Sequence, residues 1–144
     1  MTLHVCPPTM RGALCAVPML LALWATPASA QDTPAPSLPA PHTLGSVQYR
    51  CGGIGSDESQ ALRAAMPQHK LSLLMARSDG AYLADVAIRL EGANVAAHFT
   101  ADGPVCLLDL PDGTYTLTAT APDGQTQRHQ LQVGAPGQVV QLRY

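Results

Sequence analysis

Residues 102–121, with the sequence DGPVCLLDLPDGTYTLTATA, determine the fold class of this chain. Residues 105–110 are almost wholly apolar, which is typical of a buried strand, and apolar residues alternate with threonines over 114–121, which is typical of a half-buried strand. Pro111, Asp112 and Gly113 lie between them and suit a tight turn, because proline presets φ and glycine reaches the left-handed region. The stretch therefore predicts a β-hairpin.

Asp-Gly pairs recur along the second half of the chain. They stand at 79–80, 102–103, 112–113 and 123–124, and a proline precedes the last two. They separate segments of strand length, and turn signals at such spacing are typical of an all-β sandwich or barrel.

Five further segments alternate with the period of two expected for strands. Their inward residues are Leu71, Leu73 and Met75; Val86, Ile88 and Leu90; Val95, Ala97 and Phe99; His129, Leu131 and Val133; and Val140, Leu142 and Tyr144. With the two strands of 102–121 they predict a seven-stranded, two-layer sandwich. Tyr115 stands where sandwich domains often carry a tyrosine whose hydroxyl bonds back to the preceding turn, although plain core packing also explains it.

A short strand at 47–50 and a glycine-rich bend precede the one segment with helical character. Ser56 suits an N-cap, two acids follow in the first turn, and Pro67 is expected to end the helix. We expect one short N-terminal helix at about 56–66. The bend does not match a nucleotide-binding turn, because Glu58 takes the place of the third glycine and no P-loop lysine follows.

The first 30 residues are typical of a secretory signal. Arg11 provides a positive region, residues 13–24 are apolar, and Ala28-Ser29-Ala30 offers small residues for cleavage, whether translation starts at Met1 or Met10. The apolar run is shorter than the ~20 residues of a spanning helix. We expect a periplasmic or secreted protein with no membrane span after signal cleavage.

Prolines at 34, 36, 39 and 41 predict that residues 31–46 are an extended tether. Residues 47–144 then form a single domain, small enough to benefit from a covalent cross-link.

The cysteines offer that cross-link. Cys6 and Cys15 belong to the predicted signal, which leaves Cys51 and Cys106 in an exported chain. A disulfide between them is expected in an oxidising compartment. The alternative is a free thiol at Cys51 and a buried, hydrophobe-like Cys106.

Charge argues against some partners. Beyond residue 30 the chain has seven Lys and Arg against ten Asp and Glu, a formal net charge of −3, without a basic cluster. A nucleic-acid partner is therefore not expected.

Two stretches carry a resemblance to a known family. Residues 110–119, LPDGTYTLTA, and residues 80–88, GAYLADVAI, resemble the carboxypeptidase regulatory-like, or transthyretin-like, β-sandwich. The chain from Tyr49 onward is also similar to small exported proteins of Gram-negative bacteria that carry this domain. The resemblance implies an Ig-like or transthyretin-like sandwich and says almost nothing about activity, since fold does not imply function.

One relative, the transthyretin-like hydrolase of hydroxyisourate, implies a histidine-dependent activity. Its C-terminal Tyr-Arg-Gly-Ser is missing here, because the chain ends Gln141-Leu142-Arg143-Tyr144. An active site would need two of three histidines in one concavity with an arginine. The candidates are His69, His98 and His129, with Arg50, Arg89 or Arg143.

A second alternative is a weak periplasmic copper site. Met66, His69 and Met75 offer the thioether and imidazole ligands that copper prefers. Neither alternative has a recognisable motif, so we predict no catalytic residue, no metal ligand and no cofactor. The expected function is a non-catalytic module that binds a protein, an envelope component or a small ligand.

Overall fold

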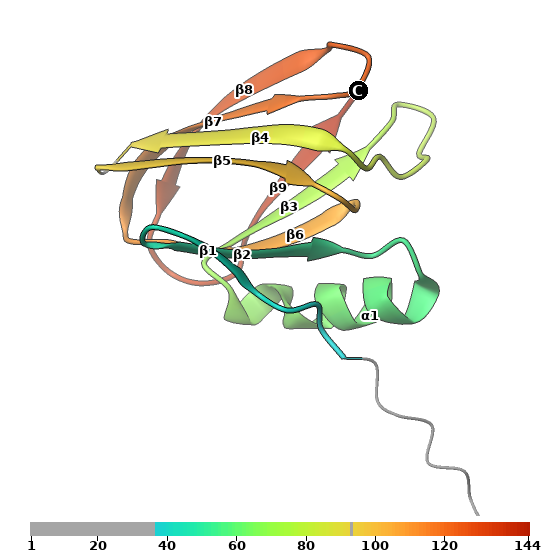
Figure 1. The fold of residues 1–144 in the computed structure, drawn as a ribbon, viewed down its shortest axis with the longest axis horizontal. Coiled ribbons are helices and arrows are strands. Elements are labelled where there is room, and N and C mark those ends of the chain that lie inside the picture. The colour runs from blue at the N-terminus through green and yellow to red at the C-terminus, as the bar shows by residue number, and fades with distance from the viewer. Residues whose placement is uncertain (1–36, 93) are drawn as a thin grey trace, which may run out of the picture. The chain divides into compact units, whose positions relative to one another are not determined.

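Two β-sheets packed face to face form the part of the protein that the structure describes (Figure 1). The structure is a computed structural model, and it describes residues 37–92 and 94–144. The predicted signal at 1–30 and the first part of the predicted tether, 31–36, lie outside the described residues.

Sheet A has five strands in the order β1-β2-β6-β3-β9, and sheet B has four in the order β5-β4-β7-β8. The strands of sheet A are β1 (His42–Leu44), β2 (Val47–Gly52), β6 (Val105–Asp109), β3 (Leu71–Ala76) and β9 (Gln138–Arg143). Those of sheet B are β5 (Val95–Ala101), β4 (Val86–Gly92), β7 (Gly113–Thr120) and β8 (Thr126–Val133). All pairs are antiparallel except β3 and β9, which run parallel with Leu71 opposite Gln138.

The two-layer sandwich is confirmed, but the expected seven strands are nine. The count of seven left out β2, which corresponds to the short strand predicted at 47–50, and β1, which lies inside the range 31–46 predicted to be a tether. All three residues of β1 are exposed, so no alternation marks it in the sequence. It is an edge strand that forms only because β2 offers it backbone hydrogen bonds.

The predicted hairpin of 102–121 is wrong, because its two strands belong to different sheets. β6 pairs with β2 and β3 in sheet A, whereas β7 pairs with β4 and β8 in sheet B. Residues 110–112 therefore cross from one layer to the other. Burial gives the reason: β6 is the middle strand of sheet A and is covered on both faces, whereas β7 buries only one.

The true hairpins join β1 to β2, β4 to β5 and β7 to β8. The last uses Pro122, Asp123 and Gly124 as expected, with Gly124 at φ +88° and its amide donating to the carbonyl of Ala121 over 2.9 Å. Three of the Asp-Gly pairs fall between strands and Gly113 of the fourth begins β7, but only Asp123-Gly124 joins two strands that pair with each other.

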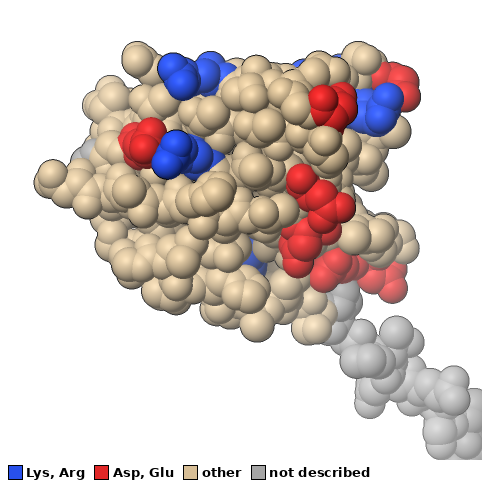
Figure 2. All heavy atoms as spheres, turned by 45° about the horizontal axis from the view of Figure 1, so that its top comes forward, with Lys and Arg blue, Asp and Glu red and all other residues tan. Residues whose placement is uncertain are grey.

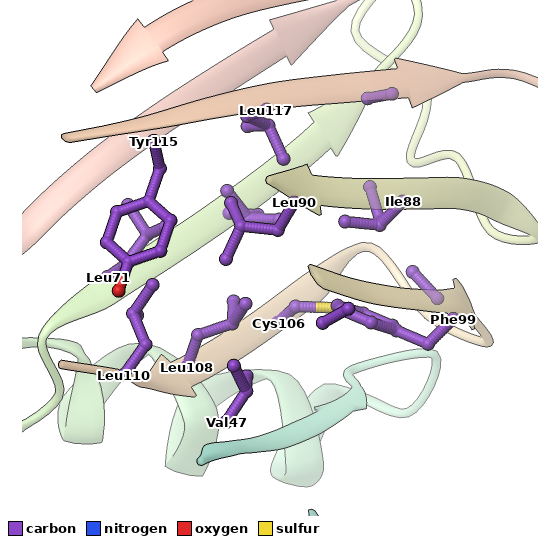
Figure 3. Close-up of a cluster of buried hydrophobic side chains, with 14 of the residues drawn as sticks. Val47, Leu71, Ile88, Leu90, Phe99, Cys106, Leu108, Leu110, Tyr115 and Leu117 are labelled. Atoms are coloured by element: carbon purple, nitrogen blue, oxygen red, sulfur yellow. The ribbon is translucent and has the colours of Figure 1, made fainter. Parts of the chain in front are cut away.

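The main core fills the space between the sheets (Figure 3). The predicted inner faces of β3, β4 and β7 are buried, and the half-buried Val95, Val140 and Tyr144 pack at the margin. The rings of Tyr49 and Phe99 stack with centroids 4.0 Å apart and join β2 to β5. At the other side of the sandwich, the Gln127 side-chain amide donates to the Arg143 carbonyl.

A disulfide joins Cys51 and Cys106, which lie directly opposite each other on β2 and β6. Both sulfur-bearing residues are buried in the core. The bond confirms the predicted pairing and indicates an oxidising compartment. None of the helices among the described residues is long and apolar enough to cross a membrane.

Helix α1 (Ser56–Ala65) continues into the short 3₁₀ helix η1 (Met66–Gln68), and both follow two strands, so the helix is not N-terminal as expected. Gly55, not Ser56, is the N-cap. Glu58 accepts a hydrogen bond from the Gly53 amide over 2.8 Å, so its carboxylate satisfies an amide donor beside the start of the helix. Pro67 occupies the first turn of η1, a position that needs no amide hydrogen, and so it does not end the helical segment.

Candidate functional site

Helix α1 covers only part of the outer face of sheet A (Figure 1). Leu62, Ala65 and Met66 pack there against Val105 and Leu107 of β6. The outer residues of β3 and β9 extend beyond this contact, and Val139 on β9 is 43 % exposed. A cleft results between the helix and the last strand of the sheet.

We call this hollow the Tyr82 cleft, after the side chain at its rim. It has a volume of about 220 Å³, and its lining includes Arg63, Leu74, Ala76, Tyr82, Gln141 and Arg143. Aliphatic carbons of β3 provide its floor, while the helix and β9 each provide a guanidinium. Sheet A and helix α1 hold these side chains except Tyr82, which lies in the connection between β3 and β4.

Tyr82 is held over the cleft by contacts at both ends. Its backbone bridges to Ala76 of β3, and the next amide, of Leu83, donates to the Met75 carbonyl over 3.2 Å. Arg63 lies 5.2 Å from the ring centroid and donates from Nη2 to the Tyr82 hydroxyl over 2.7 Å. The Arg63 Nε donates to Ser59 Oγ over 3.3 Å. The tyrosine and the guanidinium therefore fix each other, although Tyr82 is 61 % exposed.

A second hollow lies on the other side of the Arg63–Tyr82 contact. We call it the Ile54 hollow; it measures about 410 Å³ and is lined by 53–56, Ser59, Gln60 and the same Arg63 and Tyr82. Ile54 is 78 % exposed, the highest fraction among the large apolar side chains that the structure describes. An exposed isoleucine beside an exposed tyrosine is a feature of binding surfaces.

The charges around the Tyr82 cleft are one-sided. No aspartate or glutamate is among its lining residues. Within the described part of the chain, neither Arg63 nor Arg143 lies within ion-pair distance of a carboxylate. The arrangement offers an apolar floor, an aromatic rim and two cationic donors.

The three candidate histidines lie in separate places. His69 precedes β3, His98 is exposed on β5 opposite Arg89, and His129 is half-buried on β8 with Gln127 Oε1 3.3 Å from its Nε2. Neither the Tyr82 cleft nor the Ile54 hollow contains a histidine. The structure thus does not bring two of them together with Arg50, Arg89 or Arg143.

His69 has a partner that the sequence analysis missed. Its Nδ1 lies 2.6 Å from Asp109 Oδ2, and the Lys70 amide donates to the other oxygen of the same carboxylate over 3.1 Å. The Lys70 ammonium in turn donates to Asp112 Oδ1 and to the Gly134 carbonyl. This network joins the start of β3 to the end of β6 and to the β8–β9 connection. An antiparallel pairing of β3 with β6 would have predicted the contact, but the sequence does not reveal which strands pair.

The proposed copper ligands do not converge. Met66 belongs to the cluster beneath α1, on the outer face of sheet A, whereas Met75 is buried between the two sheets. Sheet A itself separates them. Across the residues that the structure describes, no three His, Cys, Asp or Glu side chains are grouped as they would be around a metal ion.

The described residues form a disulfide-linked, two-sheet β-sandwich with a cleft on its surface. No protein-family model matches the sequence, and no curated protein matches it either.

Proposed function

We propose that this protein is an exported, non-catalytic β-sandwich module that binds a ligand or partner at the Tyr82 cleft and the Ile54 hollow. The observation that carries the proposal is the exposure of Ile54 and Tyr82 side by side with two hollows that share Arg63 and Tyr82. Fixing an exposed tyrosine with an arginine reduces the entropy lost when a ligand orders the surface.

The cellular location and the relatives of the protein belong to the same proposal. We infer a periplasmic or secreted location, which the disulfide supports because such bonds persist in oxidising compartments. We also infer a relationship to the carboxypeptidase regulatory-like sandwiches from residues 110–119. The hydrogen bond from Tyr115 to the preceding turn supports it, since this contact recurs in sandwich domains.

Nucleic acid is not part of the proposal. On the face shown in Figure 2, basic groups are scattered, several next to acidic ones, and acidic groups gather at one side. Such a surface lacks the continuous basic stripe of a nucleic-acid interface.

The proposal is tested by ligand-observed NMR on the full-chain secreted protein. A library of envelope-derived glycans, peptides and small metabolites is screened against the wild type, Tyr82→Ala and Leu44→Ser. A hit that Tyr82→Ala abolishes and Leu44→Ser retains supports the proposal, since Leu44 is exposed on β1 and does not line either hollow.

The same samples separate binding from hydrolysis. Mass spectrometry of the bound compound after prolonged incubation should return its original mass. A hydrolysed product whose formation is lost in His69→Gln would overturn the non-catalytic proposal in favour of the histidine-dependent hydrolase.

A further inference from the structure

The Tyr82 cleft has a chemical preference that its residues specify. We propose that it binds a carboxylate attached to an apolar body, either a free small acid or the terminal residue of a peptide. This inference rests on the binding function proposed above and names the class of ligand.

The charge of the cleft favours an anionic ligand. Arg63 on α1 and Arg143 on β9 both line it, and no acidic side chain does. Two other arginines have a carboxylate nearby, since Arg77 lies 3.7 Å from Asp79 and Arg89 lies 3.5 Å from Glu91, whereas Arg50 and Arg128 have no ion pair among the described residues. Two guanidinium groups without a carboxylate partner, at one concavity, favour an anionic ligand, and guanidinium binds carboxylate through paired hydrogen bonds.

The floor of the cleft favours a ligand with an apolar body. Leu74 and Ala76 of β3 are half-buried and line the cleft, and Leu74 packs beside the cluster beneath α1, so the floor between the two arginines is hydrocarbon. An inorganic anion would leave this floor exposed to water, whereas an aliphatic or aromatic acid would cover it and gain the hydrophobic contribution. The Tyr82 ring extends the apolar surface upward.

The size of the cleft limits the ligand. Its volume of about 220 Å³ is below the ~300–1,000 Å³ of pockets that hold drug-sized molecules. One side chain with its carboxylate fits this class of volume, and a longer peptide would have to extend outward from the cleft.

Arg63 is already oriented for this role. Ser59 and the Tyr82 hydroxyl each accept one of its hydrogen bonds, which holds the guanidinium plane while leaving further N–H donors available. Gln127 donates to the Arg143 backbone carbonyl, but no hydrogen bond or ion pair within the described residues engages the Arg143 guanidinium, so its whole donor set is available to the ligand.

The test uses two matched pairs of probes and the isotope-labelled full-chain protein. Phenylacetate is compared with phenylacetamide, and N-acetyl-leucine with N-acetyl-leucine amide, by backbone amide NMR titration. We expect both acids to shift the amides of 141–143 and Tyr82, and each neutral amide to bind roughly tenfold more weakly because it loses the charge-assisted hydrogen bonds. Equal affinity of acid and amide would overturn the inference.

Variants locate the effect. Arg143→Gln and Arg63→Gln should each weaken acid binding roughly tenfold, whereas Arg128→Gln on β8, which does not line the cleft, should leave it unchanged. Each variant is accepted only if its amide spectrum retains wild-type dispersion. Because Arg63 also holds Tyr82, Arg143→Gln gives the decisive result, and unchanged affinity in that variant contradicts the inference.

The two acids separate the possible sources of the carboxylate. Tighter binding of N-acetyl-leucine than of phenylacetate assigns the cleft to peptide termini, and the reverse order assigns it to free small acids. If the library screen instead yields a ligand that shifts only residues of the Ile54 hollow, the carboxylate inference fails while the binding function stands. If no compound perturbs either hollow, the binding function itself fails.

Discussion

The Tyr115 hydroxyl donates a hydrogen bond to the carbonyl of Pro111 over 2.8 Å. Tyr115 is the third residue of β7 in sheet B, and Pro111 lies in the segment that leads there from β6 of sheet A. The bond therefore stabilises the segment that connects the two sheets. Its ring fills the core beside Leu71 and Leu110 (Figure 3). Both readings of this tyrosine from the sequence, turn contact and core packing, are therefore correct.

Tyr115→Phe should lower the free energy of unfolding by about 1 kcal/mol, the usual net value of one hydrogen bond. The ring stays in place, so the change isolates the bond to Pro111. Urea unfolding followed by circular dichroism measures it. Tyr144→Phe is the matched control, because the Tyr144 hydroxyl is buried without a hydrogen-bond partner and its removal should cost nothing. Equal losses in the two variants would contradict the assignment.

The double variant Cys51→Ala/Cys106→Ala should be less stable by about 2–5 kcal/mol. The disulfide closes a segment of sequence separation 55 and lies in the buried core, so its loss releases the unfolded chain and leaves a smaller side chain on each strand. Thermal unfolding under non-reducing conditions measures the loss. Wild-type protein treated with a strong reductant should approach the stability of the variant, and no change on reduction would contradict the prediction.

Gly103→Ala should destabilise the protein by about 1–3 kcal/mol or more, the range for forced overpacking. A Cβ at this position would overlap the carbonyl oxygen of Gly52, which is backbone and cannot rotate away. Gly134→Ala is the control, since its Cβ would meet nothing within 4 Å and its φ lies outside the left-handed region. Chemical denaturation of the two variants should separate them clearly; similar midpoints would show that residues 52 and 103 are not packed this closely.

The alternation of side chains predicted most of the fold, because each strand's burial is a local property. Leu71, Leu73 and Met75 of β3 are buried between the sheets as their spacing implied. The assignment of strands to sheets was not local. Residues 105–110 and 114–121 have the pattern of a hairpin. In the structure, β2 and β3 occupy both edges of β6, so β7 cannot pair with β6 and lies in the other sheet.

The candidate site was the least predictable part, for the same physical reason. Arg63, Tyr82 and Arg143 are separated by 19 and 61 residues and line one cleft only after α1 packs on the outer face of sheet A. No motif joins them in the sequence. The sequence did contain one signal at Tyr82. It is an aromatic residue outside every predicted strand, where core packing does not explain it.

Stability should fall in alkali as Tyr144 ionises. Burial, with a smaller contribution from Asp123, raises the pKa of Tyr144 from 10.0 to about 12. The folded protein therefore holds this proton more tightly than the unfolded chain, so the stabilisation is fully present below about pH 10 and is lost as the pH rises toward 12. Burial and then Asp112 raise the pKa of Tyr115 as well, which adds to the same trend.

Urea unfolding at a series of pH values between 8 and about 11.5 measures this loss. Tyr144→Phe removes the titrating hydroxyl and should make the alkaline decline shallower while leaving the stability at pH 8 unchanged or slightly higher. Tyr82→Phe removes an exposed hydroxyl and should retain the wild-type slope. A Tyr144→Phe curve that runs parallel to the wild type through pH 11 would mean that the buried environment of Tyr144 does not govern the alkaline loss of stability.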